Sequence, residues 1–135
     1  MDESPRVGMR SPLGRVTGLG SAKDGTGHWW AQRLSALALV PLASWLLISI
    51  LTLPNLGYAA VHDWLSRPLE GFLAALCTGT LTYHSYLGTT VVVEDYVHGR
   101  AAKLLSLIGL KFMHVLVGGA GIFAILRLTM GTLVS

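Results

Sequence analysis

Two histidines placed inside long apolar stretches are the first residues that point to chemistry. His84 lies near the middle of the uncharged stretch 71–93, and His114 lies within the apolar stretch 104–126. With a rise of about 1.5 Å per helical residue, both lie about 15 Å from the charged segment that joins the two stretches. Lipid gives an imidazole neither a hydrogen bond nor a metal, so a histidine at that depth needs a partner on another helix or a bound metal ion. One chain could in principle supply both axial ligands of one metal centre.

The helix face that carries His84 has room for a flat cofactor. Thr80 lies one turn before it and Gly88 one turn after it, and both are small. A planar porphyrin needs such space, but a histidine hydrogen-bonded to a neighbouring helix fits the same pattern, so both interpretations stay open. The other histidines lie at or beyond the ends of the apolar stretches, where a solvated imidazole is the ordinary outcome. They are His28, His62 and His98.

A carboxylate and a phenol close the stretch that contains His84. Asp95 and Tyr96 lie at its end, at the boundary between lipid and water if the stretch spans a bilayer. A phenol donates a hydrogen bond to a quinone carbonyl and a neighbouring carboxylate offers a route for protons, so the pair fits a quinone site. An interfacial tyrosine beside a helix-ending acid is the commoner outcome of the same pattern.

Arg33 stands at the entrance to a further apolar stretch, 34–53, directly after Trp29 and Trp30. Tryptophan rings suit the headgroup layer, and an arginine there anchors a helix on the cytoplasmic side. A guanidinium also pairs with carboxylates through two parallel hydrogen bonds, which suits a cofactor propionate or a quinone pocket. The sequence does not separate these two roles.

Three stretches long enough to cross a membrane position these residues. About 20 apolar residues cover a hydrocarbon layer of about 30 Å, and we therefore predict an all-α membrane protein with three transmembrane helices. Pro41 predicts a kink in the first span, and Lys111 lies near enough to the end of the third for its side chain to reach the headgroups. The intervening residues 54–70 are rich in turn formers and charges and predict a loop. The three predicted spans are approximately residues 34–53, 71–93 and 104–126.

The composition excludes several other classes of protein. The chain has 135 residues, of which 52% are hydrophobic and 13% charged, and a globule of this size could not bury that much apolar surface. The net charge is +3, but the basic residues are dispersed rather than gathered in a stripe, so we expect no nucleic acid partner. Cys77 is the single cysteine and lies in an apolar stretch, which excludes an internal disulfide and favours a packing role.

The distribution of basic residues predicts the orientation in the membrane. Residues 1–27 form a polar tail rich in glycine, serine and arginine, separate from a membrane anchor domain at 28–135. Basic residues concentrate in that tail and in the second loop, which holds Arg100 and Lys103, whereas the first loop has Arg67 alone. By the positive-inside rule the N-terminus faces the cytoplasm and the C-terminus the periplasm.

Two segments carry a resemblance to a known family. They are 28–36, HWWAQRLSA, and 84–98, in which HSYLG leads to EDYVH. The chain resembles the hydrophobic membrane anchor, the D subunit, of succinate dehydrogenase (complex II), particularly the alphaproteobacterial type. The resemblance covers roughly residues 28–127 and leaves the glycine-rich tail outside. Ser35 stands where the family commonly has threonine, and the hydroxyl is retained.

The resemblance implies a role for each candidate residue. His84 would be one axial ligand of haem b, with the second ligand on the partner anchor subunit, which makes His114 a packing or polar residue. Tyr96 would hydrogen-bond ubiquinone with the support of Asp95, and Arg33 would lie near the haem propionates and the quinone pocket.

The implied function is the anchor of succinate:ubiquinone oxidoreductase in the bacterial inner membrane, which links the tricarboxylic acid cycle to electron transport. Its partners would be a flavoprotein subunit, an iron–sulfur subunit and a second haem-binding anchor subunit. The chain has neither a dinucleotide-binding glycine pattern nor a cysteine cluster, so it would be a non-catalytic subunit of that enzyme. Two alternatives stay open, namely a menaquinone-linked fumarate reductase anchor and a non-redox membrane scaffold or assembly protein.

Overall fold

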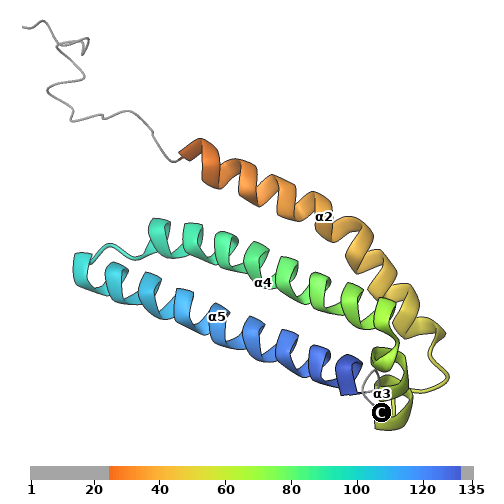
Figure 1. Ribbon diagram of the computed structural model, residues 1–135. Coiled ribbons are helices and arrows are strands. Elements are labelled where there is room, and N and C mark those ends of the chain that lie inside the picture. Colours follow the sequence, from red (N-terminus) through yellow and green to blue (C-terminus); the bar gives the residue numbers. More distant parts are fainter. Residues whose placement is uncertain (1–24, 132–135) are drawn as a thin grey trace, which may run out of the picture.

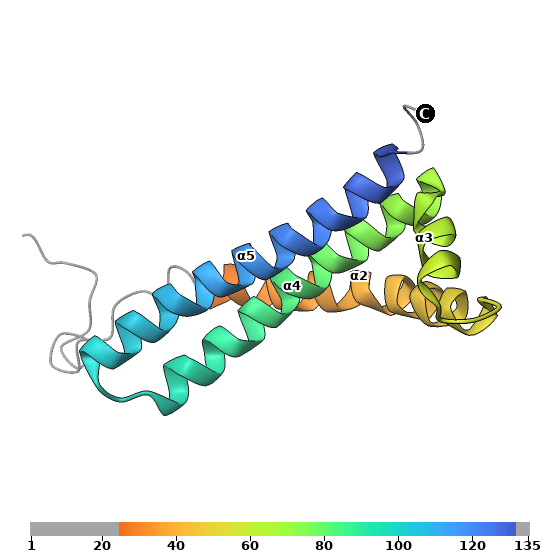
Figure 2. The same ribbon diagram turned by 90° about the horizontal axis from the view of Figure 1, so that it is seen from below.

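The computed structural model describes residues 25–131, which fold into four helices (Figure 1). The long helix α4 contacts α2 on one side and α5 on the other, and within the described residues α2 and α5 do not contact each other. The short helix α3 packs against α4 and α5 at one end of the bundle. Figure 2 shows that α4 and α5 run side by side. The helices are α2 (Gly25–Thr52), α3 (Tyr58–Ser66), α4 (Pro68–Tyr96) and α5 (Arg100–Gly131).

The prediction of an all-α protein is confirmed, and each of the three predicted spans coincides with one long helix. Two helices of the described part are both long and apolar enough to cross a membrane, Thr26–Thr52 and Arg100–Gly131. α2 continues through Pro41 and curves along its length. α4 has the necessary length but is richer in hydroxyl groups than the other two, since its uncharged stretch contains many threonines.

The hydroxyl groups of α4 find their partners within the helix itself. Thr78 donates a hydrogen bond to the carbonyl of Ala74 at 2.8 Å, and Thr82 donates to the carbonyl of Thr78 at 2.7 Å. Thr80, Thr89 and Thr90 make the same bond to the residue one turn back. A hydroxyl satisfied in this way exposes no unpaired donor to lipid. The polarity of α4 is therefore compatible with a buried or lipid-facing helix.

The structure corrects the prediction of a loop over residues 54–70, because α3 lies within that segment. Trp64 stacks on Trp45 of α2 with ring centroids 5.8 Å apart and is 9% exposed. Thr129 of α5 donates a hydrogen bond to the carbonyl of Leu65 at 2.9 Å. These tertiary contacts hold one helical face against α2 and α5, and they outweigh the turn formers on either side.

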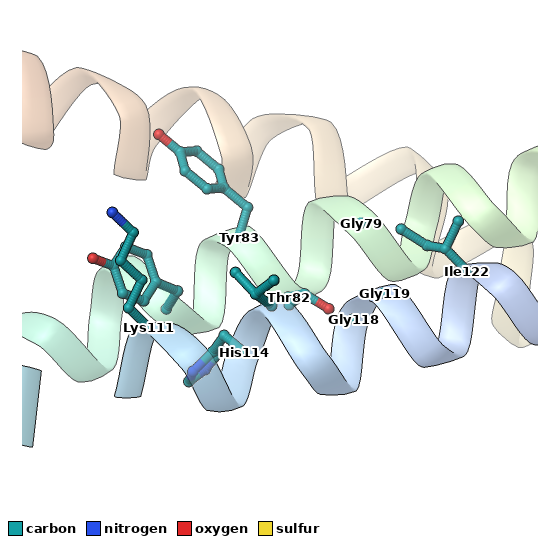
Figure 3. A pocket seen from close by; sticks show the side chains of 10 residues that line it. Gly79, Thr82, Tyr83, Lys111, His114, Gly118, Gly119 and Ile122 are labelled. Atoms are coloured by element: carbon teal, nitrogen blue, oxygen red, sulfur yellow. The ribbon is translucent and has the colours of Figure 1, made fainter. Parts of the chain in front are cut away.

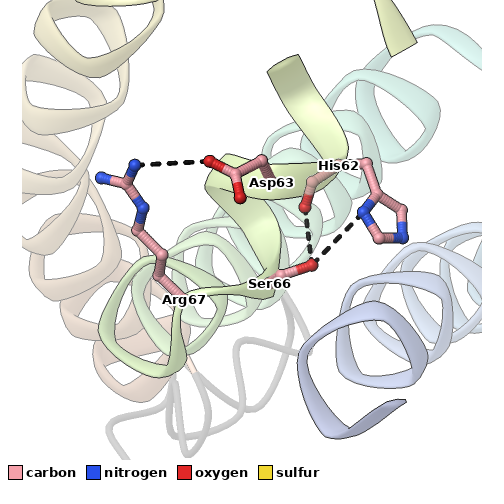
Figure 4. Close-up of polar contacts among 4 residues, drawn as sticks. All are labelled: His62, Asp63, Ser66 and Arg67. Atoms are coloured by element: carbon pink, nitrogen blue, oxygen red, sulfur yellow. Dashed lines mark hydrogen bonds and ion pairs between the residues drawn. The ribbon is translucent and has the colours of Figure 1, made fainter. Parts of the chain in front are cut away.

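Short-range polar contacts complete the turn between α3 and α4 (Figure 4). Ser66 donates to the carbonyl of His62 at 2.7 Å, and its Oγ lies 3.4 Å from Nδ1 of the same histidine. Arg67 pairs with Asp63 at 3.4 Å, but both side chains are mostly exposed, so this ion pair contributes little. Pro68 then begins α4, at the helix position that proline favours.

Small residues set the close approach of α4 and α5. A Cβ atom at Gly118 would lie 2.6 Å from the side chain of Thr82, and one at Gly71 would overlap the side chain of Thr129. A Cβ at Gly121 would lie 3.2 Å from Thr78. Small residues facing a partner helix are the usual means of packing helices in membranes, where the hydrophobic effect does not drive them together.

Few apolar side chains of the described residues are buried within the chain. The buried ones are Trp64, Ala74, Cys77 and Leu87, and the burial of Cys77 agrees with its expected packing role. Large apolar side chains cover all three long helices and face outward, among them Leu51 at 74% exposure and Leu116 at 69%. So much exposed apolar surface requires lipid or other protein subunits around the bundle.

Candidate functional site

His84 lies between α4 and α2, with both ring nitrogens in contact with α2. Its Nδ1 lies 2.9 Å from the hydroxyl of Ser35, and its Nε2 lies 3.4 Å from the amide nitrogen of Gln32. Ser35 is 7% exposed and His84 is half-buried, so the contact lies within the helix interface. We expect either a neighbouring helix or a metal beside this histidine from its depth, and α2 is a neighbouring helix that contacts it.

The hydrogen-bond partners of His84 admit one tautomer that suits a metal. The hydroxyl of Ser35 lies 3.1 Å from the backbone carbonyl of Gln32 and 2.9 Å from Nδ1 of His84, and it has one proton for the two contacts. If that proton goes to the carbonyl, the oxygen accepts from Nδ1–H, and Nε2 keeps a lone pair towards the amide NH₂ group of Gln32. A histidine with one nitrogen donating to an oxygen and the other unprotonated is in the state that binds a metal.

Gln32 lies against Nε2 of His84, where an iron-bound cofactor would have to sit. The 3.4 Å contact with Gln32 is long for a hydrogen bond, and the side-chain oxygen of Gln32 is buried without a partner in the described residues. A Cβ at Gly88 would meet only the Gln32 amide, at 3.6 Å. A ring bound at Nε2 would therefore have to displace the side chain of Gln32.

His114 belongs to a different interface. Its Nδ1 lies 2.9 Å from the carbonyl of Leu110, and its Nε2 lies 3.3 Å from the hydroxyl of Ser85 on α4. Its ring meets that of Tyr86 edge-on, with centroids 5.8 Å apart. The structure therefore does not bring the two membrane-depth imidazoles together. Residues 25–131 also contain no group of three or more histidine, cysteine or acidic side chains arranged for a metal ion.

Arg33, Asp95 and Tyr96 lie towards the same end of the bundle, where α2 begins and α4 ends (Figure 1). The guanidinium of Arg33 lies 5.3 Å from the ring centre of Trp29, a cation–π contact. Asp95 and Tyr96 are exposed, the tyrosine at 78%. In the described part of the chain, no hydrogen bond or ion pair joins the three candidate residues. They form one exposed end rather than a closed pocket.

The connection between α4 and α5 holds this end in place. Lys103 donates a hydrogen bond to the carbonyl of Glu94 at 2.6 Å, and His98 lies with Nδ1 3.0 Å from the carbonyl of Tyr96. Basic side chains near the last carbonyls of a helix also complement its dipole. The last turn of α4 is therefore tied to α5 while the side chain of Tyr96 points outward.

The sequence analysis did not identify the two residues that contact His84. Gln32 and Ser35 lie with His28 on one face of α2, at a spacing of four and then three residues, and Nε2 of His28 is buried without a partner in the described residues. The sequence signal that could have identified them is a set of polar residues with this spacing at the start of an apolar helix. The pairing of Ser35 with His84 depends on the register between two helices, which spacing within one helix does not specify.

An all-helical fold with outward-facing apolar side chains is that of an integral membrane subunit. The chain belongs to the family of succinate dehydrogenase/fumarate reductase transmembrane subunits, which matches residues 8–118. The match begins 20 residues earlier than expected and thus includes much of the segment that we had placed outside the resemblance.

Relatives match this chain over most of its length. It is 32% identical to the succinate dehydrogenase hydrophobic membrane anchor subunit of Rickettsia bellii over 87% of this chain and 94% of the relative. It is 28% identical to the subunit of the same name from Paracoccus denitrificans, over 92% of this chain and 95% of the relative. The succinate dehydrogenase membrane anchor subunit of Reclinomonas americana is 30% identical over 63% of this chain and 73% of the relative. The family expected from the two sequence segments is therefore confirmed.

Proposed function

We propose that this chain is the membrane anchor subunit of a succinate:ubiquinone oxidoreductase, that it helps to bind haem b, and that it forms part of the ubiquinone site. The names and near-complete coverage of the relatives support the anchor role. The observation that carries the haem assignment is the 2.9 Å contact between Nδ1 of His84 and the hydroxyl of Ser35, which can orient the imidazole with Nε2 free to bind iron.

A bound b-type haem would supply one-electron exchange with the quinone. In this chain His84 would hold the iron through Nε2 while Ser35 keeps the ring oriented through Nδ1. Arg33 lies on the same helix as Ser35, and its guanidinium is free of ion pairs in the described residues, so it is available to a propionate. The second axial ligand would come from a second anchor subunit, because His114 lies in another interface.

Tyr96 and Asp95 are proposed for the ubiquinone site at the end of α4. The phenol would donate a hydrogen bond to a quinone carbonyl, and the adjacent carboxylate would pass protons from water. Both side chains are exposed in the isolated chain, which leaves them open to the iron–sulfur subunit and to quinone. The flavoprotein subunit would deliver electrons to that iron–sulfur subunit.

We infer that α2, α4 and α5 all cross the bacterial inner membrane, with the N-terminus in the cytoplasm and the C-terminus in the periplasm. α4 has 29 residues and would extend about 43 Å at 1.5 Å per residue, more than the hydrocarbon layer requires. The bonds of its threonines to its own carbonyls and its position between the other two helices support this placement.

Purification of the tagged chain from membranes tests the assignment. We expect it to bring with it succinate-oxidising activity that reduces a ubiquinone analogue. A menaquinone-linked fumarate reductase anchor, which the family description also covers, would instead prefer a low-potential naphthoquinone and the reverse reaction. A scaffold or assembly protein would purify without either activity.

A further inference from the structure

A cavity of about 340 Å³ lies between α4 and α5, outside the contact of His84 with α2 (Figure 3). Its wall is almost wholly apolar towards Gly119 and Ile122, and it also includes Tyr83, Tyr86 and Lys111. The proposed haem and ubiquinone sites use none of these residues. The cavity therefore needs an explanation of its own.

One end of the cavity is cationic and the other apolar. Lys111 is exposed and has no ion-pair partner in the described residues, although it lies within the third predicted span. Side chains on a helix tilt towards its N-terminus, which for α5 is the proposed cytoplasmic end, so the ammonium group extends towards the headgroup layer. In Figure 3 Lys111 lies at one end of the cavity and Ile122 at the other.

Gly119 keeps the apolar end open. A Cβ atom at this position would find no atom within 4 Å, whereas a Cβ at the neighbouring Gly118 would collide with Thr82. Gly118 is thus needed for helix packing and Gly119 is not. Gly119 lies on the wall of the cavity, so the absence of a side chain at this position keeps that space open.

We propose that this cavity binds one anionic phospholipid from the surrounding bilayer, with its phosphate at Lys111 and an acyl chain along Gly119 and Ile122. Lys111 and Ile122 are 11 helical steps apart, which extends about 16 Å along α5, a length that suits one acyl chain. An ammonium group that extends to the headgroup layer meets phosphate groups, whose oxygens accept its hydrogen bonds. A neutral quinone or an apolar helix of another subunit would leave the lysine unpaired.

The purified whole complex, reconstituted in nanodiscs, tests this proposal by native mass spectrometry. Retained phosphatidylglycerol and phosphatidylcholine are counted while the ratio of the two lipids is varied. We expect one phosphatidylglycerol per copy of this chain, retained at least about tenfold more weakly after Lys111→Gln or Gly119→Leu. Gly109→Leu is the matched control, since a Cβ there also meets open space but Gly109 does not line the cavity.

Four results would overturn the proposal. Equal retention of the two lipids, or retention that neither variant changes, would show that no anionic phospholipid binds specifically in the cavity. Ubiquinone retained in place of phosphatidylglycerol and lost in Gly119→Leu would make the cavity a quinone-tail site. Loss of another subunit from the Gly119→Leu complex, with Gly109→Leu intact, would show that a protein helix covers the cavity. The proposal does not depend on haem binding at His84.

Discussion

The hydroxyl of Ser35 has one proton, which it can donate either to the carbonyl of Gln32 or to Nδ1 of His84. We propose that it goes to the carbonyl, so that the oxygen accepts the Nδ1 proton of the imidazole. Ser35 is buried and His84 is half-buried, which limits the access of water to both groups. A ligand histidine is usually held in this way by an oxygen on its far side, and loss of that oxygen weakens metal binding.

Ser35→Ala removes the acceptor and frees the ring of His84 to rotate or change tautomer. We expect the affinity of the purified complex for haem to fall by roughly 10- to 100-fold and the midpoint potential of the haem to shift. Ser35→Thr keeps the hydroxyl and should retain the native values. Haem per complex and redox titration measure both effects. Ser44→Ala is the matched control, because that hydroxyl bonds only to the carbonyl of Val40 in its own helix. Native haem retention and potential in Ser35→Ala would contradict the orienting role.

Tyr96→Phe removes the phenolic proton at the exposed end of α4. We expect ubiquinone reduction by succinate to fall by about 100-fold or more, since a positioned proton donor contributes about that much. Succinate oxidation with a soluble dye as acceptor should continue, because it does not need the quinone site. Tyr58→Phe is the control, since this tyrosine is equally exposed but lies on α3 at the other end of the bundle. Equal quinone reduction in both variants would place the quinone elsewhere.

At the scale of the elements, α4 is the central helix, which contacts both α2 and α5. Its face towards α2 carries His84, and its face towards α5 is packed through glycine–threonine contacts. The close approach at Gly118 has no room for a larger side chain.

Gly118→Val should therefore destabilise the packing of α4 on α5 by about 1–3 kcal/mol, the usual cost of overpacking. Thermal unfolding of the complex in mild detergent measures the change. Gly109→Val places the same residue in α5 where a Cβ meets no neighbour, and should lower stability much less. Similar melting temperatures for the two variants would show that the glycine contact does not limit the packing.

The helices could be predicted from sequence better than their contacts. Long apolar runs indicated α2, α4 and α5, because a charge inside a membrane is costly, and only the run of α5 contains one, Lys111. Depth marked both His84 and His114, and the family resemblance selected His84. α3 was missed because packing of Trp64 on Trp45 stabilises it, and no local pattern reports a contact between residues so far apart. The same holds for Ser35, whose partner is 49 residues away.

At the scale of the whole molecule, the bundle lacks an apolar core of its own and exposes its large side chains. Such a chain is stable only in lipid and against its partner subunits. Its proposed orientation places the loop between α2 and α3 outside and the loop between α4 and α5 in the cytoplasm.

Single cysteines test that orientation in a Cys77→Ser background. A maleimide that does not cross membranes should label Asn55→Cys in intact spheroplasts and label Gly99→Cys only after the membrane is permeabilised. The reverse pattern would invert the topology. Labelling of both positions from the outside would mean that α4 does not cross the membrane.

The central claim is that His84 holds haem iron, and the dithionite-reduced minus oxidised spectrum of the purified complex tests it most directly. We predict a b-type signal that is lost or shifted in His84→Ala and unchanged in His114→Ala, whose imidazole lies at similar depth but in the other interface. A native complex without haem absorbance, or a signal that survives His84→Ala unaltered, would contradict the assignment and leave the bond to Ser35 a purely structural contact between helices.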